Sequence, residues 1–185
     1  MLSFLISSNM NLKPKFWNSD KIVSISAILI SLTTMAIYLY QTHLMKKQQN
    51  AAVMPYIRVM YSFDHDRFEV LVLNEGLGPA FIDEVNTYYM GKKYEHQDLP
   101  DFFQNEYTKI DSTLSLNYSN ISEDMLFTAG KTLWVVSTKN SEEKAQKLYD
   151  LFLNNKIEME ITFSSIYGEK WKVRGVSKRP EKISD

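Results

Sequence analysis

Cysteine is absent from this sequence of 185 residues, which excludes disulfide bonds and cysteine-based metal sites within it. A phosphate-binding loop is also lacking. Gly130-Lys131-Thr132 imitates the end of that motif, but Met125 stands where the first glycine is required, and the residues that follow are strand-like rather than helical. We therefore expect a turn that leads into a strand at this position, and no nucleotide site.

Acidic residues outnumber basic ones beyond the first 50 residues. Those residues carry a net charge of +4, from five lysines and Asp20, whereas the remaining 135 carry −5, and the whole chain carries −1. A nucleic-acid partner requires a positive footprint for its phosphates. We therefore expect no nucleic-acid partner for this acidic domain.

The stretch 22–44 contains no Asp, Glu, Lys or Arg. As a helix it would be about 34 Å long, enough to cross a bilayer core of about 30 Å. Trp17 and Lys21 before it, and Tyr38 and Tyr40 near its far end, are typical of membrane interfaces. A cleaved signal peptide is the alternative, but its apolar region is shorter, about 7–15 residues, and it ends at a small-residue cleavage site that this run lacks. The sequence thus predicts a retained, single-pass transmembrane helix in contact with membrane lipid.

Basic residues leave the orientation of this helix nearly balanced. Three lie on each side of it: Lys13, Lys15 and Lys21 before, and Lys46, Lys47 and Arg58 after. The free amino terminus and the acidity of the domain slightly favour a domain outside the cytoplasm. A cytoplasmic domain is the alternative.

One face of the predicted helix carries small side chains at spacings of three, four and three. They are Ser24, Ala27, Ser31 and Thr34. Such a stripe lets a second helix approach closely, so it is a candidate helix–helix contact for a homo-oligomer. Serine and threonine are also common in single-pass helices without any such role.

The composition of the chain changes along its length and indicates five segments. We predict an N-terminal tail (1–21), a transmembrane helix (22–44), a helical stalk (45–55), a β-sandwich domain (56–175) and a charged tail (176–185). Pro55 disfavours helix at the residue before it and marks the start of the domain.

The domain has the pattern of a mainly β fold. Short apolar or alternating runs predict about seven strands, among them 56–62, 67–74, 81–89, 132–137 and 157–163. In the last of these, Glu158, Glu160 and Thr162 are expected to point away from the core. One or two short helices interrupt the strands, one capped by Asp98 and one by Asn140 with Glu143. The strand spacing predicts an antiparallel sandwich or small barrel and argues against a doubly wound sheet.

A glycine-rich turn joins the second and third predicted strands. Gly76 and Gly78 would allow positive φ angles there, and Pro79 would stiffen the exit from the turn. We interpret these residues as structural rather than as a ligand loop.

Residues that could carry chemistry are few and scattered. His43 lies at the membrane end of the helix. Asp64-His65-Asp66 and the group Glu95-His96 with Asp98 could offer metal ligands, but they lie in turn-like stretches where such residues are ordinary. Ser164 and Ser165 lack the glycine elbow of a nucleophilic serine. We therefore assign no catalytic, cofactor-binding or metal-ligating residue and expect no cofactor and no enzymatic activity.

Three segments together carry a resemblance to a known group of proteins. They are Gln-Gln-Asn-Ala-Ala-Val-Met-Pro-Tyr (48–56), Leu-Asn-Glu-Gly-Leu-Gly-Pro-Ala-Phe-Ile (73–82) and Ser-Ser-Ile-Tyr-Gly-Glu-Lys-Trp (164–171). With the single helix, they resemble a group of small, uncharacterised bacterial single-pass membrane proteins. The resemblance covers most of residues 17–175 and implies an immunoglobulin-like β-sandwich after the helix. It implies no activity.

Two hypotheses about function follow from the sequence. The first is a membrane-anchored, non-enzymatic β-sandwich module for binding or assembly, with an unidentified protein partner. The alternative is a membrane effector or sensor with a cytoplasmic domain, which oligomerises through its transmembrane helix.

Overall fold

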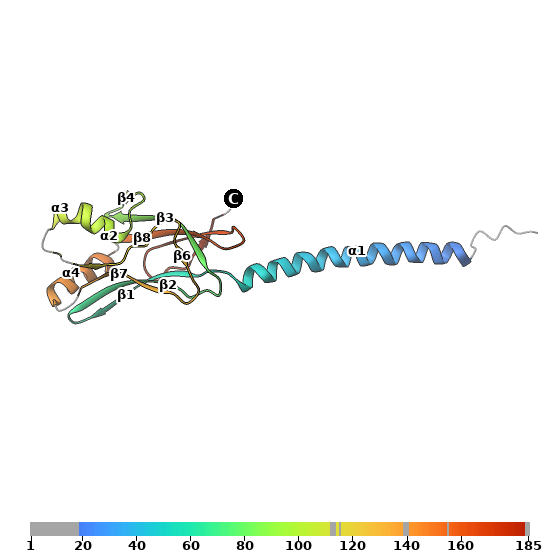
Figure 1. Cartoon of the computed structure of the whole chain (residues 1–185), viewed down its shortest axis with the longest axis horizontal. Coiled ribbons are helices and arrows are strands. Elements are labelled where there is room, and N and C mark those ends of the chain that lie inside the picture. The colour runs from blue at the N-terminus through green and yellow to red at the C-terminus, as the bar shows by residue number, and fades with distance from the viewer. Residues whose placement is uncertain (1–18, 112–113, 115, 139–140, 155, 184–185) are drawn as a thin grey trace, which may run out of the picture. The chain divides into compact units, whose positions relative to one another are not determined.

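The computed structural model describes residues 19–111, 114, 116–138, 141–154 and 156–183. Its first element, α1 (Ser19–Ala52), is one continuous helix that is long and apolar enough to cross a membrane. None of its residues is buried. The chain divides into two compact units, with the boundary between Lys47 and Gln48; the second unit is the domain described below (Figure 1).

The hydroxyl groups of α1 hydrogen-bond to its own backbone. Ser24, Ser31 and Thr34 each donate to the carbonyl oxygen four residues earlier, at 2.8–2.9 Å. This confirms that these polar side chains can be satisfied without a partner outside the helix, as an apolar environment requires.

The first sheet of the domain contains four antiparallel strands in the order β1-β2-β7-β5. They are β1 (Ile57–Asp64), β2 (Arg67–Asn74), β7 (Thr132–Ser137) and β5 (Asn117–Tyr118). Every second residue of β2 is buried, beginning with Phe68, whereas its alternate residues face outward. The sequence alternation therefore directs one face of this sheet to the core.

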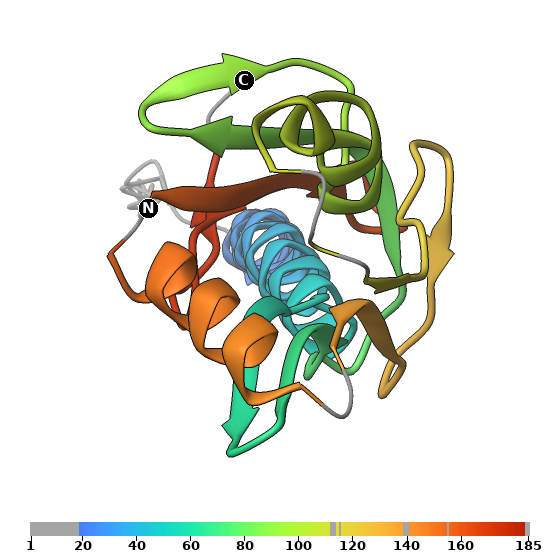
Figure 2. The ribbon, with the colours of Figure 1, turned by 90° about the vertical axis from the view of Figure 1, so that its left-hand side faces the viewer.

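The second sheet is also antiparallel, in the order β10-β9-β8-β3-β4, with β6 paired to β3. Its strands are β3 (Ala80–Tyr89), β4 (Lys92–Tyr94), β6 (Leu126–Phe127), β8 (Ile157–Ser164), β9 (Lys170–Arg174) and β10 (Glu181–Lys182). The domain is thus mainly β, as the sequence predicted. Figure 2 shows the two sheets as separate layers of the domain.

Both sheets contribute to one hydrophobic core. Its members include Val59, Phe68, Val70 and Val72 from the first sheet and Ile82, Val85, Ile161 and Phe163 from the second. Burying a large apolar side chain stabilises the fold by about 1.5–3 kcal/mol. The sandwich therefore has an ordinary source of stability without disulfide bonds.

Short helices cover parts of the domain. α4 (Glu142–Leu153) packs against the first sheet, where the rings of Phe68 and Phe152 lie 5.3 Å apart. α2 (Leu99–Phe102), a π-helical turn η1 (Phe103–Tyr107) and α3 (Thr108–Ile110) follow β4. The Asp98 carboxylate caps α2 by accepting from the N–H of Asp101 at 2.8 Å, as predicted.

Several details differ from the sequence-based expectations. Glu160 points away from the core, as predicted, but it is buried on the outer face because polar side chains from neighbouring strands surround it. The tail contains β10, which pairs with β9. The α4 cap is Ser141, whose Oγ accepts from the N–H of Lys144, while Asn140 lies outside the described residues.

The glycine-rich turn is structural, but for a different reason from the one predicted. Gly76 and Gly78 do not have positive φ angles. Instead, the backbone of Val53 to Tyr56 approaches so closely that a Cβ atom at either glycine would overlap it. Close approach of two backbones, rather than an unusual φ angle, therefore requires glycine here.

Asn74 connects the segment Val53 to Tyr56 with the glycine-rich turn. Its side chain is buried; Oδ1 accepts from the N–H groups of Tyr56 and Gly76, at 3.1 and 3.0 Å. Its Nδ2 donates to the carbonyl oxygens of Gly78 and Phe127, at 2.9 and 3.1 Å. One amide thus connects the arriving chain, the β2–β3 turn and the strand β6.

We predict that Asn74→Ala destabilises the domain by about 2–4 kcal/mol, because it leaves two buried and two partly buried backbone groups without their partner. Urea unfolding of the full chain in detergent, followed by near-ultraviolet circular dichroism, measures the change. Asn117→Ala, at an exposed position of β5, is the matched control and should unfold like the parent protein. Equal midpoints for the two variants would contradict the role of Asn74.

Candidate functional site

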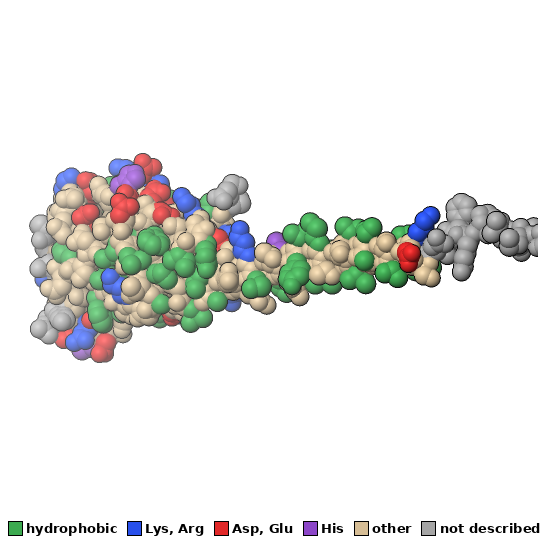
Figure 3. Space-filling view, turned by 45° about the vertical axis from the view of Figure 1, so that its right-hand side comes forward, with side chains coloured by type: hydrophobic (Ala, Val, Ile, Leu, Met, Phe, Trp, Pro, Cys, Tyr) green, Lys and Arg blue, Asp and Glu red, His purple; other side chains and the backbone are tan. Residues whose placement is uncertain are grey.

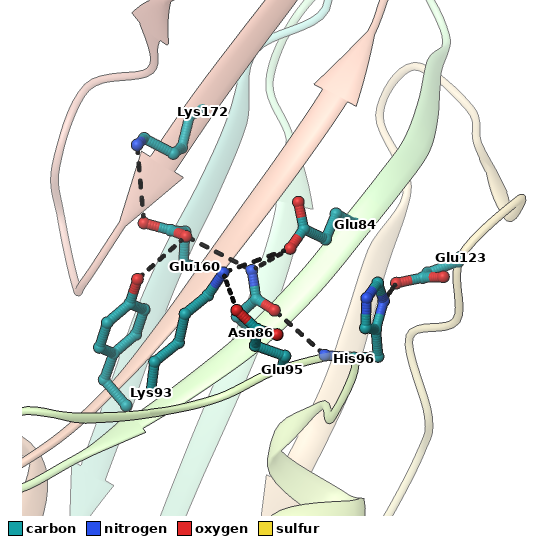
Figure 4. Close-up of polar contacts among 9 residues, drawn as sticks. Glu84, Asn86, Lys93, Glu95, His96, Glu123, Glu160 and Lys172 are labelled. Atoms are coloured by element: carbon teal, nitrogen blue, oxygen red, sulfur yellow. Dashed lines mark hydrogen bonds and ion pairs between the residues drawn. The ribbon is translucent and has the colours of Figure 1, made fainter.

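The outer face of the second sheet carries the densest polar cluster in the described part of the chain. Alternate residues of four adjacent strands place these side chains on one face, and Figure 4 shows most of them converging. They are Glu84, Asn86 and Tyr88 of β3, Glu158 and Glu160 of β8, Lys172 and Arg174 of β9, and Lys93 of β4.

Asn86 lies at the centre of this polar face and is fully buried. Its Nδ2 donates to Glu84 Oε1 at 2.8 Å and to Glu160 Oε1 at 3.4 Å, and its Oδ1 accepts from the His96 N–H at 3.1 Å (Figure 4). A buried amide must find such partners. Asn86 therefore fixes two carboxylates and the loop after β4 relative to one another.

Lys93 connects two carboxylates on the β4 side of the face. Its Nζ lies 3.4 Å from both Glu84 Oε1 and Glu95 Oε1. The hydrogen bond from Asn86, together with the charge of Lys93, lowers the pKa of Glu84 below its usual value. Glu84 is therefore held as a carboxylate.

Glu160 contacts two further side chains of the polar face, on the side of β9. Tyr88 Oη donates to it at 3.3 Å, and Lys172 Nζ lies 3.8 Å from it. Burial, reinforced by the charge of Glu160, raises the pKa of Tyr88. The Arg174 guanidinium stacks 3.6 Å from the centroid of the Tyr88 ring and donates twice to Glu158, at 2.7 and 3.0 Å.

A cavity of about 290 Å³ adjoins the polar face beyond β4. It is lined mainly by polar side chains, with Ile121 and Val85 as the apolar members; the others are His96, Asp98, Asp101, Asn120, Ser122 and Glu123. Figure 3 shows acidic side chains and a histidine along this edge of the domain.

Two side chains of the cavity are held by specific contacts. His96 Nδ1 lies 2.6 Å from Glu123 Oε1, and this hydrogen bond raises the pKa of His96. Asp98 is buried and accepts from the N–H groups of Asp101 and Ile121, at 2.8 and 2.9 Å. Burial raises the pKa of Asp98 despite these hydrogen bonds.

A second cavity, of about 430 Å³, lies at the β9 edge of the same face. Its walls carry four basic and two acidic side chains: Lys172, Arg174, Lys178, Arg179, Glu158 and Glu181. The polar face thus runs from an acidic edge beside β4 to a basic edge beside β9. Such an arrangement suits recognition of a partner surface with the opposite order of charges.

The groups of residues singled out in the sequence do not assemble into a metal centre. Among the described residues, no cluster of three or more His, Asp or Glu side chains could hold a metal ion. His65 lies in the β1–β2 turn, 3.6 Å from Glu142, and His96 pairs with Glu123. Ser164 Oγ donates to Asp83 Oδ1 at 3.0 Å.

The helix-contact residues and the turn residues lie where the sequence placed them. Ser24, Ala27, Ser31 and Thr34 all lie on α1, and Gly76, Gly78 and Pro79 lie between β2 and β3. Gly130-Lys131 forms the turn before β7, as predicted.

The clustering of the polar side chains on one face of the second sheet was not predicted from the sequence. Alternate polar residues in 84–88 and 158–162 were its only local signal, because the contacts join strands that are far apart in the chain. The comparisons with known proteins add no precedent: no known protein family matches the chain, and no curated protein is significantly similar to it.

We predict that Glu123→Gln moves the pKa of His96 back toward the ordinary histidine value, because it removes the carboxylate that stabilises the imidazolium. Nuclear magnetic resonance titration of the histidine Cε1–H signals measures this change. Glu142→Gln, which alters the carboxylate beside His65, is the matched control and should leave the His96 titration unchanged. An unchanged His96 titration in Glu123→Gln would contradict the pairing.

The pair also predicts the sign of a pH dependence. Because the pKa of His96 is raised in the folded protein, its contribution to stability is complete below the unfolded value of about 6.5. This contribution to stability is lost as the pH rises through the raised pKa of His96. The parent protein should therefore show a small loss of stability over this window that Glu123→Gln lacks.

Proposed function

We propose that this protein is a single-pass membrane protein that displays a non-enzymatic, immunoglobulin-like β-sandwich as a binding or assembly module. The observation that carries the proposal is the exposure of α1. Its stretch 22–44 is free of charge and long enough to cross a bilayer, and α1 contains no buried residue. Exposing each large apolar side chain to water costs about 1.5–3 kcal/mol, and a lipid bilayer removes that cost.

The strand order supports the immunoglobulin-like part of the proposal. In that fold, strands A-B-E-D form one sheet and G-F-C the other, with C′ added in variable-type domains. Taking β1, β2 and β3 as A, B and C gives β1-β2-β7-β5 as A-B-E-D and β9-β8-β3-β4 as G-F-C-C′. The resemblance to small bacterial single-pass membrane proteins is part of the same proposal.

The polar face supports binding or assembly as the role of the domain. Its charges are paired with one another and fixed by Asn86 and by the Arg174–Tyr88 stack. Side chains that are already ordered lose little conformational freedom when a partner binds. We propose that a protein with a complementary charged surface binds this face.

Cysteine labelling tests the anchor and its orientation, because the chain has no cysteine of its own. We predict that Asn50→Cys and His65→Cys react with a membrane-impermeant maleimide in intact cells, as an exported domain requires. The protein should also stay in the membrane pellet at alkaline pH with residues 22–44 still attached. Labelling only after lysis would favour a cytoplasmic domain, and loss of residues 22–44 from the mature protein would overturn the anchor.

A cytoplasmic effector or sensor that oligomerises through α1 is the second candidate. It is favoured by the stripe of Ser24, Ala27, Ser31 and Thr34, whose hydroxyls are satisfied within the helix. Small side chains without free polar groups allow close packing of two helices.

Substitution on the two faces of α1 tests this second candidate. Ala27→Leu with Ser31→Leu should weaken self-association in detergent and in membranes, because the larger side chains block close approach. Thr33→Leu with Ala36→Leu makes a similar enlargement of two side chains on the opposite face and should leave association unchanged. An oligomeric state unaffected by either pair would exclude association through the stripe.

A further inference from the structure

Exposed apolar side chains gather at one end of the domain. They belong to four segments that are distant in the sequence: Leu77, Phe81, Leu126, Ile166, Tyr167 and Ile183. Leu77 is the most exposed, at 79%. We call this group the junction patch.

The strand directions place these residues together. Phe81, at the start of β3, pairs with Leu126 of β6 and with Ser164 at the end of β8. Ile166 and Tyr167 follow in the β8–β9 turn. The N–H of Ile183 donates to the carbonyl oxygen of Lys170, the first residue of β9, at 2.9 Å.

The same end of the domain receives the chain from α1. Leu77 lies between Gly76 and Gly78, whose Cα atoms lie against the backbone of Val53 to Tyr56. Helix continues from the end of the uncharged stretch at Leu44 to Ala52, a length of about 12 Å. The headgroup region beyond each side of the hydrocarbon core is about 5–8 Å thick. A connection as short as Met45 to Ala52 therefore keeps the end of the domain that carries the junction patch within reach of the lipid surface.

The chemistry of the patch suits that surface. It combines aliphatic side chains with Phe81 and Tyr167, which are residue types that partition into the boundary between headgroups and acyl chains. The acidic side chain of Glu169 is paired with Lys182 at 2.7 Å, and exposed Lys170 adds positive charge that anionic headgroups attract.

The opposite end of the domain has a different character. Its β1–β2 turn carries Asp64, His65, Asp66 and Arg67, and Glu142 lies beside His65. The far end thus combines these charged side chains with exposed apolar ones such as Met90 and Leu153, whereas the junction patch is apolar with basic side chains beside it. A surface of anionic lipid complements that pairing of apolar and basic side chains.

We propose that the junction patch docks on the lipid headgroup interface, so that the domain rests on the membrane surface instead of standing clear of it. This inference rests on the proposed membrane anchor. Lipid is the proposed binding partner of the patch. A second copy of the chain and a different protein are the alternatives, and the experiment below distinguishes them from lipid.

Spin labels on single cysteines in the full chain test the proposal. Ile166→Cys reports on the patch, His65→Cys on the far end and Ser26→Cys on the anchor. The protein is reconstituted into phosphatidylcholine vesicles, with and without phosphatidylglycerol. Collision rates with oxygen, which concentrates in lipid, and with a water-soluble nickel chelate give the depth of each label.

We expect the label at Ser26 to lie in the hydrocarbon core. At Ile166 we expect loss of nickel accessibility and a gain in oxygen accessibility relative to His65, strengthened by phosphatidylglycerol. If Ser26 is deep but Ile166 is as accessible to nickel as His65, the docking inference is overturned and the anchor stands. If Ser26 itself is in water, both the anchor and the docking inference fail.

Dilution with lipid distinguishes the occupants. Shielding of Ile166 by lipid persists as the ratio of lipid to protein rises, whereas shielding by a second copy disappears, which would overturn the proposal. Shielding that persists without a gain in oxygen accessibility would indicate burial inside the protein and would also overturn it.

Charged substitutions provide a second, independent test. Leu77→Asp with Tyr167→Asp should return the Ile166 label to water without a change in the unfolding midpoint, because both side chains are exposed in the folded domain. Met90→Asp places the same charge at another exposed apolar position, in the β3–β4 turn, and should leave the Ile166 label shielded. Equal label depths in the two variants would overturn the proposal.

Discussion

The backbone contact between the arriving chain and the β2–β3 turn constrains the rest of the domain. Two glycines make room for it, and the Asn74 side chain satisfies the polar groups that it buries. Asn74 also exchanges backbone hydrogen bonds with the turn before β7, through Gly130 and Lys131. Because Asn74 ends β2, its side chain and backbone link the residue before β1, the β2–β3 turn and the turn before β7.

The polar face and the core occupy opposite sides of the same strands. In β8, buried apolar residues alternate with Glu158 and Glu160, and neither carboxylate is left without a cation or donor nearby. The outer side of the second sheet is thus covered by ion pairs and hydrogen bonds rather than by a second apolar layer. The network around Asn86 keeps the side chains of that outer side in one arrangement.

Local patterns in the sequence predicted the strands well and the contacts between them poorly. The bounds of β2 and β7 were predicted from alternation and β-branched residues, because these signals lie within one strand. The burial of Glu160 could not be predicted, since its partners come from β3 and β9. Likewise, His96 and Glu123 are 27 residues apart in the chain, and no local sequence pattern predicts a contact between residues so far apart. The two-residue strand β10 is too short to leave an alternating signal.

The edges of the two sheets bear on whether copies of the domain can pair with one another. Unpaired edge strands are templates for pairing between copies. Three of the four edges here are β4, β5 and β10, which are only two or three residues long. The fourth, β1, is eight residues long, and the carbonyl oxygen of its Val59 accepts from the N–H of Ser177. Three of the four edges therefore offer a neighbouring copy little backbone with which to extend a sheet, and β1 is the long edge at which a charged or proline substitution would matter most for solubility.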